Sequence, residues 1–193
     1  YDNTKLVSLK DEPILNMSKS GIITEKREYE FDIVVFATGF DAVTGGLTNI
    51  DIVDTEGNAL SDRWSGGVKT YLGLGISKFP NMLMSYGPQA PTGFCNGPSS
   101  AEYQGECIVE LISYLRDNKF TRLETEERYE SIWGKKIAEL AEKTLFPKAD
   151  SWYMGANIPG KKKEMLMYPG GLPKYLEEFR SCADKRFEGF HCS

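Results

Sequence analysis

The first forty residues alternate between apolar and polar positions in short segments that predict β-strands. Residues 5–9 and 21–24 are bounded by polar or turn residues, which is typical of edge strands. The segment 29–36 ends in the β-branched and aromatic run Ile-Val-Val-Phe, a pattern of strands buried on both faces of a parallel sheet. The small residues that follow at 37–39 let the backbone pass close to a ligand, although an ordinary exit from strand to loop explains them equally well.

The pattern changes after residue 40. A flexible Gly-Gly joint at 45–46 and the surrounding residues predict a domain crossing near 41–46. Residues 50–53 read as a further strand, followed by a turn at 55–58.

Three helices are predicted from the 3.6-residue spacing of apolar positions. The first begins with the capping-box pattern of residues 99–102 and runs to about Asp117. The second starts near Thr125 and stops before Pro147, and the third starts around Pro173. The positions expected on their buried faces are Ile108, Leu111, Ile112 and Leu115, then Tyr129, Ile132, Trp133, Ile137, Leu140 and Leu145, and finally Tyr175, Leu176, Phe179 and Ala183.

A long connection, residues 148–171, separates the second helix from the third. It is rich in glycine and proline and contains Trp152. A connection of this length is uncommon in a compact domain unless it binds a ligand or moves.

Charge and composition narrow the classes of function. The 23 basic and 28 acidic side chains give a net charge of -5, which disfavours nucleic acid and anionic membranes as partners. No apolar run approaches the roughly 20 residues that span a bilayer, and the first ten residues lack the pattern of a secretion signal. The four cysteines show no C-x-x-C spacing and the only histidine is His191, so neither a metal site nor histidine-based catalysis is indicated. We expect a cytoplasmic protein that binds small molecules.

An ordered series of motifs resembles class B flavin monooxygenases. Residues 32–42, Asp-Ile-Val-Val-Phe-Ala-Thr-Gly-Phe-Asp-Ala, are similar to their ATG-type segment. The Gly-Pro-Gln-Ala-Pro sequence at 87–91 resembles the active-site loop of the Baeyer–Villiger subgroup, the relatives of cyclohexanone and phenylacetone monooxygenases. The most specific match is residues 144–161, which resemble the C-terminal control loop of that subgroup. Shorter matches lie at 44–47, 50–52, 64, 70–73, 79–81, 168–171 and 187–190.

The resemblance implies an α/β fold that is the C-terminal portion of a flavoprotein with two Rossmann-like dinucleotide-binding domains, incomplete as it stands. Residues 1–40 would be terminal strands of the NADPH-binding domain. Residues 41–193 would be the C-terminal half of the FAD-binding domain, including the control loop at 148–171. The chain has no G-x-G-x-x-G motif, and the active-site arginine of the family is expected upstream of Tyr1. No catalytic residue is therefore expected in this chain, and its expected partner is the N-terminal remainder of the same protein.

The activity implied by the resemblance uses FAD and NADPH. One oxygen atom of O2 is inserted next to a ketone carbonyl to give an ester or lactone, and the isolated chain is expected to be inactive. An N- or S-oxygenating flavin monooxygenase and a non-catalytic binding module derived from the family are the alternatives. The loop that carries Trp152 favours the Baeyer–Villiger subgroup.

The resemblance also assigns site residues. Trp152 would fold over the nicotinamide ribose, and its structural alternative is a buried aromatic anchor. Trp152 and the loop around Phe94 should line one cavity. The run Lys161-Lys162-Lys163 is expected to be solvated and not to bind phosphate. The residues expected to bind cofactor are Trp152, Asn157, Gly97, Asn96, Thr38 and Gly39, and those expected to bind substrate are Thr92, Gly93, Phe94 and Gly97.

Overall fold

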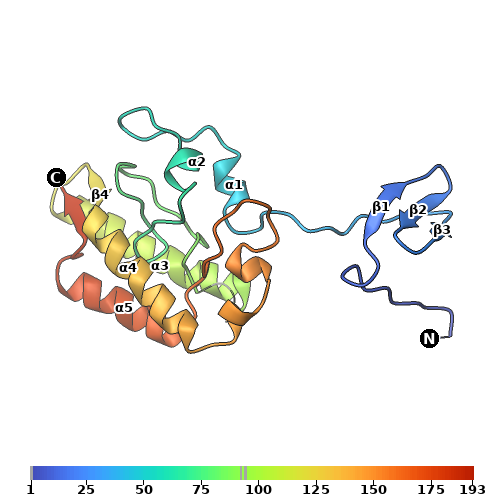
Figure 1. The fold of residues 1–193 in the computed structure, drawn as a ribbon. Coiled ribbons are helices and arrows are strands. Elements are labelled where there is room, and N and C mark those ends of the chain that lie inside the picture. Colours follow the sequence, from blue (N-terminus) through green and yellow to red (C-terminus); the bar gives the residue numbers. More distant parts are fainter. Residues whose placement is uncertain (1, 92, 94) are drawn as a thin grey trace. The chain divides into compact units, whose positions relative to one another are not determined.

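The computed structural model describes residues 2–91, 93 and 95–193. The chain forms two compact units, Tyr1–Thr38 and Gly39–Ser193, here called the N-terminal and C-terminal units (Figure 1). The division falls just before the crossing predicted at 41–46. The assignment of the two units to NADPH-binding and FAD-binding domains stays a prediction.

The N-terminal unit is a three-stranded antiparallel sheet in the order β1 (Ile14–Met17), β2 (Gly21–Thr24) and β3 (Glu28–Glu30). The strand predicted at 21–24 is confirmed, whereas the strand predicted at 5–9 is wrong because that segment pairs with no other strand in the described chain. Gly21 is required in β2, because a Cβ atom there would lie 1.8 Å from the carbonyl oxygen of Tyr29.

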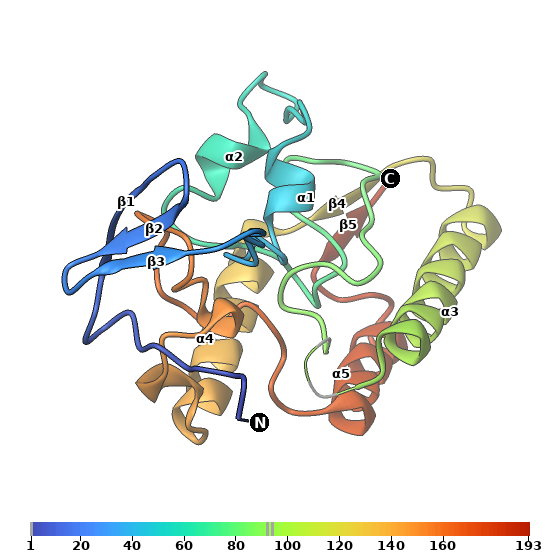
Figure 2. The ribbon, with the colours of Figure 1, turned by 90° about the vertical axis from the view of Figure 1, so that its right-hand side faces the viewer.

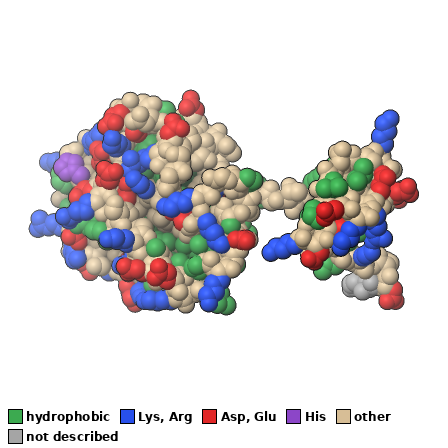
Figure 3. Space-filling model, viewed as in Figure 1, with side chains coloured by type: hydrophobic (Ala, Val, Ile, Leu, Met, Phe, Trp, Pro, Cys, Tyr) green, Lys and Arg blue, Asp and Glu red, His purple; other side chains and the backbone are tan. Residues whose placement is uncertain are grey.

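The buried strand predicted at 29–36 is mostly wrong. Strand β3 ends at Glu30, and in the part of the chain that the structure describes no strand pairs with residues 33–36. Ile33 and Val35 are 80% and 81% exposed. A β-branched run becomes a buried strand only where neighbouring strands supply hydrogen bonds on both sides, and the described residues provide none. The surface of this unit also carries other apolar side chains (Figure 3), namely Leu6, Leu9, Ile14, Leu15 and Met17.

The C-terminal unit contains the three predicted helices, α3 (Gly97–Asp117), α4 (Glu127–Glu142) and α5 (Leu172–Asp184). They lie together on one side of the unit, with the short helices α1 (Gly45–Thr48) and α2 (Leu60–Arg63) on the other (Figures 1 and 2). Strands β4 (Leu123–Thr125) and β5 (Phe190–Cys192) pair antiparallel. Two 3-10 turns, η1 (Phe146–Lys148) and η2 (Trp152–Met154), interrupt the long connection.

The start of α3 differs from the prediction. Asn96, not Ser99, is the N-cap, and its side-chain oxygen accepts a hydrogen bond from the backbone N–H of Ser99 at 3.4 Å. The helix consequently begins two residues before the predicted capping box. Leu111 is buried as expected, but Ile112 is half exposed.

The buried face of α4 is narrower than predicted. Tyr129, Trp133 and Ile137 are buried, whereas Ile132 is half exposed. At 100° per residue, position 132 points about 100° away from the middle of the stripe that these three residues form. Leu145 lies beyond the end of the helix and is also exposed.

The predicted strand at 50–53 is also wrong. Only Val53 forms an isolated bridge, with Ala59. The carboxylate of Asp54 accepts hydrogen bonds from the backbone N–H groups of Glu56 and Asn58, both at 2.8 Å. These bonds stabilise a turn and end the extended segment.

Aromatic rings from distant segments fill the core of the C-terminal unit. Trp133 of α4 stacks on Tyr168 with 5.2 Å between ring centroids. Tyr175 of α5 is fully buried, and its hydroxyl donates to the carbonyl oxygen of Leu72 at 2.8 Å and accepts from the amide of Gln104 at 3.0 Å. This packing joins α3, α4 and α5 to the loops that carry the candidate site.

Candidate functional site

A cavity of about 390 Å³ in the C-terminal unit brings together the two loops that the sequence singled out. We call it the Trp152 cavity. It is lined by Ala42, Val43, Tyr86, Gly93, Cys95, Trp152, Tyr153 and Met167. Trp152 therefore shares one cavity with Gly93 and Cys95, which flank residue 94, as expected. Thr92 and Phe94, which were predicted to bind substrate, lie outside the described residues.

Trp152 is an exposed wall of this cavity. The residue is the first of η2 and is 43% exposed. Its ring stacks on that of Tyr153 with 4.1 Å between ring centroids. The turn is set by Ser151, whose hydroxyl accepts from the N–H of Tyr153 at 3.2 Å, and by Gly155, which ends it with a φ of 68°. The alternative of a buried aromatic anchor is wrong, because the indole faces solvent.

Gly93 allows the two loops to meet. A Cβ atom at this position would lie 2.6 Å from Cε1 of Tyr153 and 2.7 Å from Sδ of Met167. Both distances are well below van der Waals contact. A side chain at position 93 would therefore push the loop away from Tyr153, so glycine sets how closely the two walls approach. The role of Gly93 toward a substrate stays a prediction.

Asn96 and Gly97 lie beside the cavity. Asn96 is engaged as the cap of α3. A Cβ atom at Gly97 would lie 3.1 Å from the hydroxyl of Tyr86, which lines the cavity. Tyr86 itself has a φ of 62°, and its backbone N–H donates to the side chain of Gln104 at 2.7 Å.

Sequence reasoning missed several walls of the cavity. Tyr86, Tyr153 and Met167 come from segments far apart in the chain. No local pattern distinguishes them from ordinary core residues, and only the folded backbone places them together.

Asn157 and Gly39 also come together. The Asn157 amide donates to the carbonyl oxygen of Phe40 at 3.1 Å. Gly39 has a φ of 83°, which favours glycine, and a Cβ atom there would lie 3.7 Å from the same amide nitrogen. Asn157 thus joins the Trp152 loop to the chain at residue 40. Thr38 is exposed and is the last residue of the N-terminal unit, and its role toward a cofactor stays a prediction.

The lysine run is paired with carboxylates. Lys161 contacts Asp41 at 2.7 Å, Lys162 contacts Glu164 at 3.1 Å, and Lys163 contacts Asp150 at 2.8 Å; these are the three ion pairs of the run. The side chain of Lys161 is only 17% exposed. The prediction of a solvated run is therefore wrong for Lys161, whose ammonium group contacts Asp41 and Thr44.

The Asp41 carboxylate is stabilised in its charged form. Burial raises its pKa, but hydrogen bonds from Lys161 and Thr44 outweigh that effect and hold the pKa below its usual value.

Cys107 and Cys182 lie in the core, where burial raises the pKa of the Cys107 thiol to about 12 and that of Cys182 to about 11. Neither buried thiol lines the Trp152 cavity.

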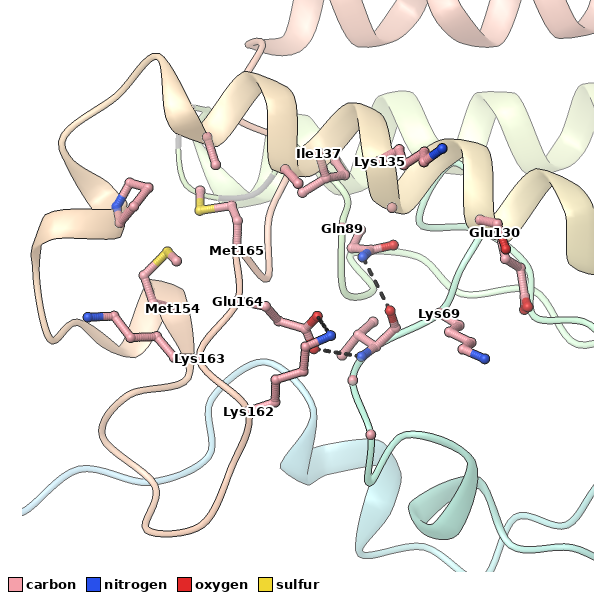
Figure 4. A pocket seen from close by; sticks show the side chains of 18 of the residues that line it. Lys69, Gln89, Glu130, Lys135, Ile137, Met154, Lys162, Lys163, Glu164 and Met165 are labelled. Carbon is pink, nitrogen blue, oxygen red and sulfur yellow. Dashed lines mark hydrogen bonds and ion pairs between the residues drawn. The ribbon is translucent and has the colours of Figure 1, made fainter.

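A second cavity of about 490 Å³ lies between α4 and residues 162–165 (Figure 4). None of the described residues that were predicted as site residues lines it. Among its lining residues, Glu164 accepts a hydrogen bond from the backbone N–H of Val68 at 2.7 Å and forms an ion pair with Lys162. Within the described residues, no helix is long and apolar enough to span a membrane.

Comparisons with known proteins place these motifs in context. No family model matches the chain. It is 51% identical over 189 residues to cyclopentanone 1,2-monooxygenase from Comamonas sp. (strain NCIMB 9872), covering 98% of this chain and 34% of that protein. It is 40% identical over 175 residues to a Baeyer–Villiger monooxygenase from Pseudooceanicola batsensis, covering 90% of this chain and 32% of that protein. It is 39% identical over 189 residues to phenazine N-monooxygenase PhzNO1 from Lysobacter antibioticus, covering 97% of this chain and 35% of that protein.

Solved structures share the fold. The closed crystal structure of cyclohexanone monooxygenase aligns with a TM-score of 0.91 at 40% identity, over 97% of this chain and 35% of that one. The structure of OTEMO in complex with FAD and NADP aligns with a TM-score of 0.92 at 34% identity, over 100% of this chain and 35% of that one. The chain thus spans about a third of the length of the relatives it matches. Its mixed helices and strands are an α/β portion of that fold, and the chain is homologous over this third to the Baeyer–Villiger-type flavin monooxygenases.

Proposed function

We propose that the chain is part of an FAD- and NADPH-dependent monooxygenase that inserts one oxygen atom of O2 next to a ketone carbonyl, giving an ester or lactone. The observation that carries this proposal is the shared cavity of Trp152 and Gly93 in a chain so similar to cyclopentanone 1,2-monooxygenase. FAD supplies the redox chemistry and NADPH the electrons.

The described lining of the Trp152 cavity suits an apolar ketone beside a planar ring system. Its walls are aromatic, aliphatic or small, and the polar side-chain groups of its described lining residues are the hydroxyls of Tyr86 and Tyr153, the thiol of Cys95 and the indole N–H of Trp152. The indole N–H of Trp152 has no partner among the described residues and the ring is partly exposed. It is available to donate to a ribose hydroxyl while the ring excludes water.

This lining does not supply a charge for the reaction. Negative charge that develops on the carbonyl oxygen of a ketone needs a fixed cation or several donors beside it. None of the described residues that line the cavity is Lys, Arg or His. We therefore propose that the arginine and the two glycine-rich phosphate-binding turns come from polypeptide equivalent to the rest of the relatives, and that the isolated chain is inactive.

Reconstitution tests this function. The chain is mixed or co-expressed with a polypeptide that corresponds to the remaining two thirds of cyclopentanone 1,2-monooxygenase. The expected result is a yellow complex that oxidises NADPH and converts a cyclic ketone to a lactone. A colourless, folded complex that binds the ketone without turnover would instead favour a non-catalytic module.

Substitution of Trp152 in the reconstituted enzyme tests its role. Loss of one hydrogen bond to the cofactor costs about 1–3 kcal/mol, so Trp152→Phe should lower kcat/KM for NADPH about 5- to 150-fold. The matched control is Tyr103→Phe, a change of a half-exposed aromatic on α3 outside the cavity. Equal kinetics for both variants would contradict the role given to Trp152.

N-oxygenation is a second candidate, because the chain is 39% identical to a phenazine N-monooxygenase. The two activities leave different products from the same reconstituted enzyme. Mass spectrometry of parallel reactions with a cyclic ketone and a phenazine distinguishes a lactone from an N-oxide.

A further inference from the structure

Three side-chain contacts join the Trp152 loop to residues 40–44. The ammonium group of Lys161 contacts the Asp41 carboxylate at 2.7 Å and the Thr44 hydroxyl at 2.5 Å. Asn157 donates to the carbonyl oxygen of Phe40. Residues 42 and 43, which lie between these contacts, line the Trp152 cavity. The contacts therefore connect one wall of the cavity to the loop that forms another.

Both members of the ion pair have further contacts that hold them in place. The Asp41 carboxylate accepts from the backbone N–H of Thr44 at 3.3 Å and from its hydroxyl at 2.9 Å. Gly45 packs so closely that a Cβ atom there would lie 2.8 Å from Cβ of Asp41. On the other side, the stem of Lys161 lies across Gly155, where a Cβ atom would lie 3.3 Å from Cδ of Lys161.

Burial distinguishes this pair from its neighbours on the same loop. The side chains of Lys161 and Asp41 are 17% and 26% exposed, whereas those of Lys163 and Asp150 are 42% and 79% exposed. Solvent screens an exposed pair, which contributes little to stability. A partly buried pair with further hydrogen bonds holds its partners more firmly.

The rest of the loop has separate anchors. The backbone N–H groups of Glu164 and Leu166 donate to the carbonyl oxygens of Met154 and Tyr153, both at 3.0 Å. Glu164 also binds the backbone of Val68 (Figure 4). These bonds fix η2 to the following segment, but none of them reaches residues 40–44. Among the described residues, the hydrogen bonds that join this loop to residues 40–44 are those of Lys161 and Asn157 given above.

We propose that Asp41 and Lys161 are positioning residues that clamp the cavity wall at residues 42–43 against the loop that carries Trp152. Without the clamp, the two walls separate while the helical core stays folded. The consequence for turnover rests on the proposed function, since a cavity held at a fixed width keeps Trp152 where it shields the cofactor.

Thiol alkylation of the 193-residue chain tests the clamp without any cofactor. Cys95 lines the cavity and reports on its opening, whereas Cys107 is buried in the core and reports on global unfolding. Asp41→Asn should raise the rate of Cys95 alkylation by iodoacetamide about tenfold, as expected for loss of a charged hydrogen bond. Amide exchange at residues 155–161 should accelerate in the same variant, and the rate at Cys107 should not change.

Two further variants complete the design. Lys163→Met breaks the exposed pair on the same loop and should leave Cys95 unchanged. The charge-swapped double variant Asp41→Lys with Lys161→Asp should restore part of the slow alkylation. The proposal is overturned if Asp41→Asn and Lys163→Met alkylate Cys95 at the same rate, or if Cys107 becomes reactive together with Cys95, since the pair would then stabilise the whole unit. Either result leaves the proposed monooxygenase function untouched, because no turnover is measured.

Discussion

Replacing Gly93 by alanine probes how tightly the two loops of the candidate site are fitted. The added methyl group would lie 2.6 Å from the ring of Tyr153 and 2.7 Å from the sulfur of Met167. The Met167 side chain is flexible and can turn away. Tyr153 has less freedom, because its ring packs between Trp152 and Phe146 with centroid distances of 4.1 Å and 5.0 Å. The strain therefore falls on the backbone of the loop.

Overpacking of this kind costs about 1–3 kcal/mol. With a urea dependence of about 2 kcal/mol/M, the unfolding midpoint of the C-terminal unit should fall by about 0.5–1.5 M. The fluorescence of the three tryptophans, all in that unit, reports the transition. Gly46→Ala is the matched control, since nothing lies within 4 Å of a Cβ atom at Gly46. A midpoint for Gly93→Ala equal to that of the control would refute the close approach of the two loops.

Three other measurements address the core that supports the site. Gly105→Ala in α3 should raise the free energy of unfolding by about 0.5–1 kcal/mol, because alanine favours helices and a Cβ atom there meets nothing within 4 Å; urea unfolding measures it. At pH 8, Cys107 and Cys182 should resist alkylation in the native chain and react in urea, since burial raises both pKa values and keeps the thiols protonated. Arg63→Ala should cost about 3–5 kcal/mol in chemical denaturation, because it leaves the fully buried Glu130 carboxylate without its cation.

The helices could be predicted from the sequence because their signals are local. The spacing of apolar positions located α3, α4 and α5, and Pro173 marks the first turn of α5. Errors at the ends of these helices arose where two local signals competed. At the start of α3, both Asn96 and Ser99 are good capping residues, and only the fold selects Asn96.

The cavity could be predicted only in part. Trp152 and Gly93 were found from motif resemblance, not from any pattern that the physics of a short segment imposes. Tyr86 and Met167 have no local signal, since one lies beside a turn and the other in an apolar run that reads as core. The Lys161–Asp41 pair was also missed, because its members are 120 residues apart and a lysine run alone predicts a solvated surface.

One physical cause links the failed strand prediction to the missing charge in the cavity. Residues 33–36 have the composition of a strand with neighbours on both sides, yet Ile33 and Val35 are four-fifths exposed. The Trp152 cavity has aromatic and small walls, yet none of its described lining residues is cationic. Residues 33–36 and the Trp152 cavity are both suited to contact with further polypeptide. The relatives carry additional chain that is about twice the length of this one. We therefore expect that the polypeptide proposed above to supply the arginine also pairs with residues 33–36. If a reconstituted complex bound FAD while residues 33–36 exchanged their amides as fast as in the free chain, the two features would need separate explanations.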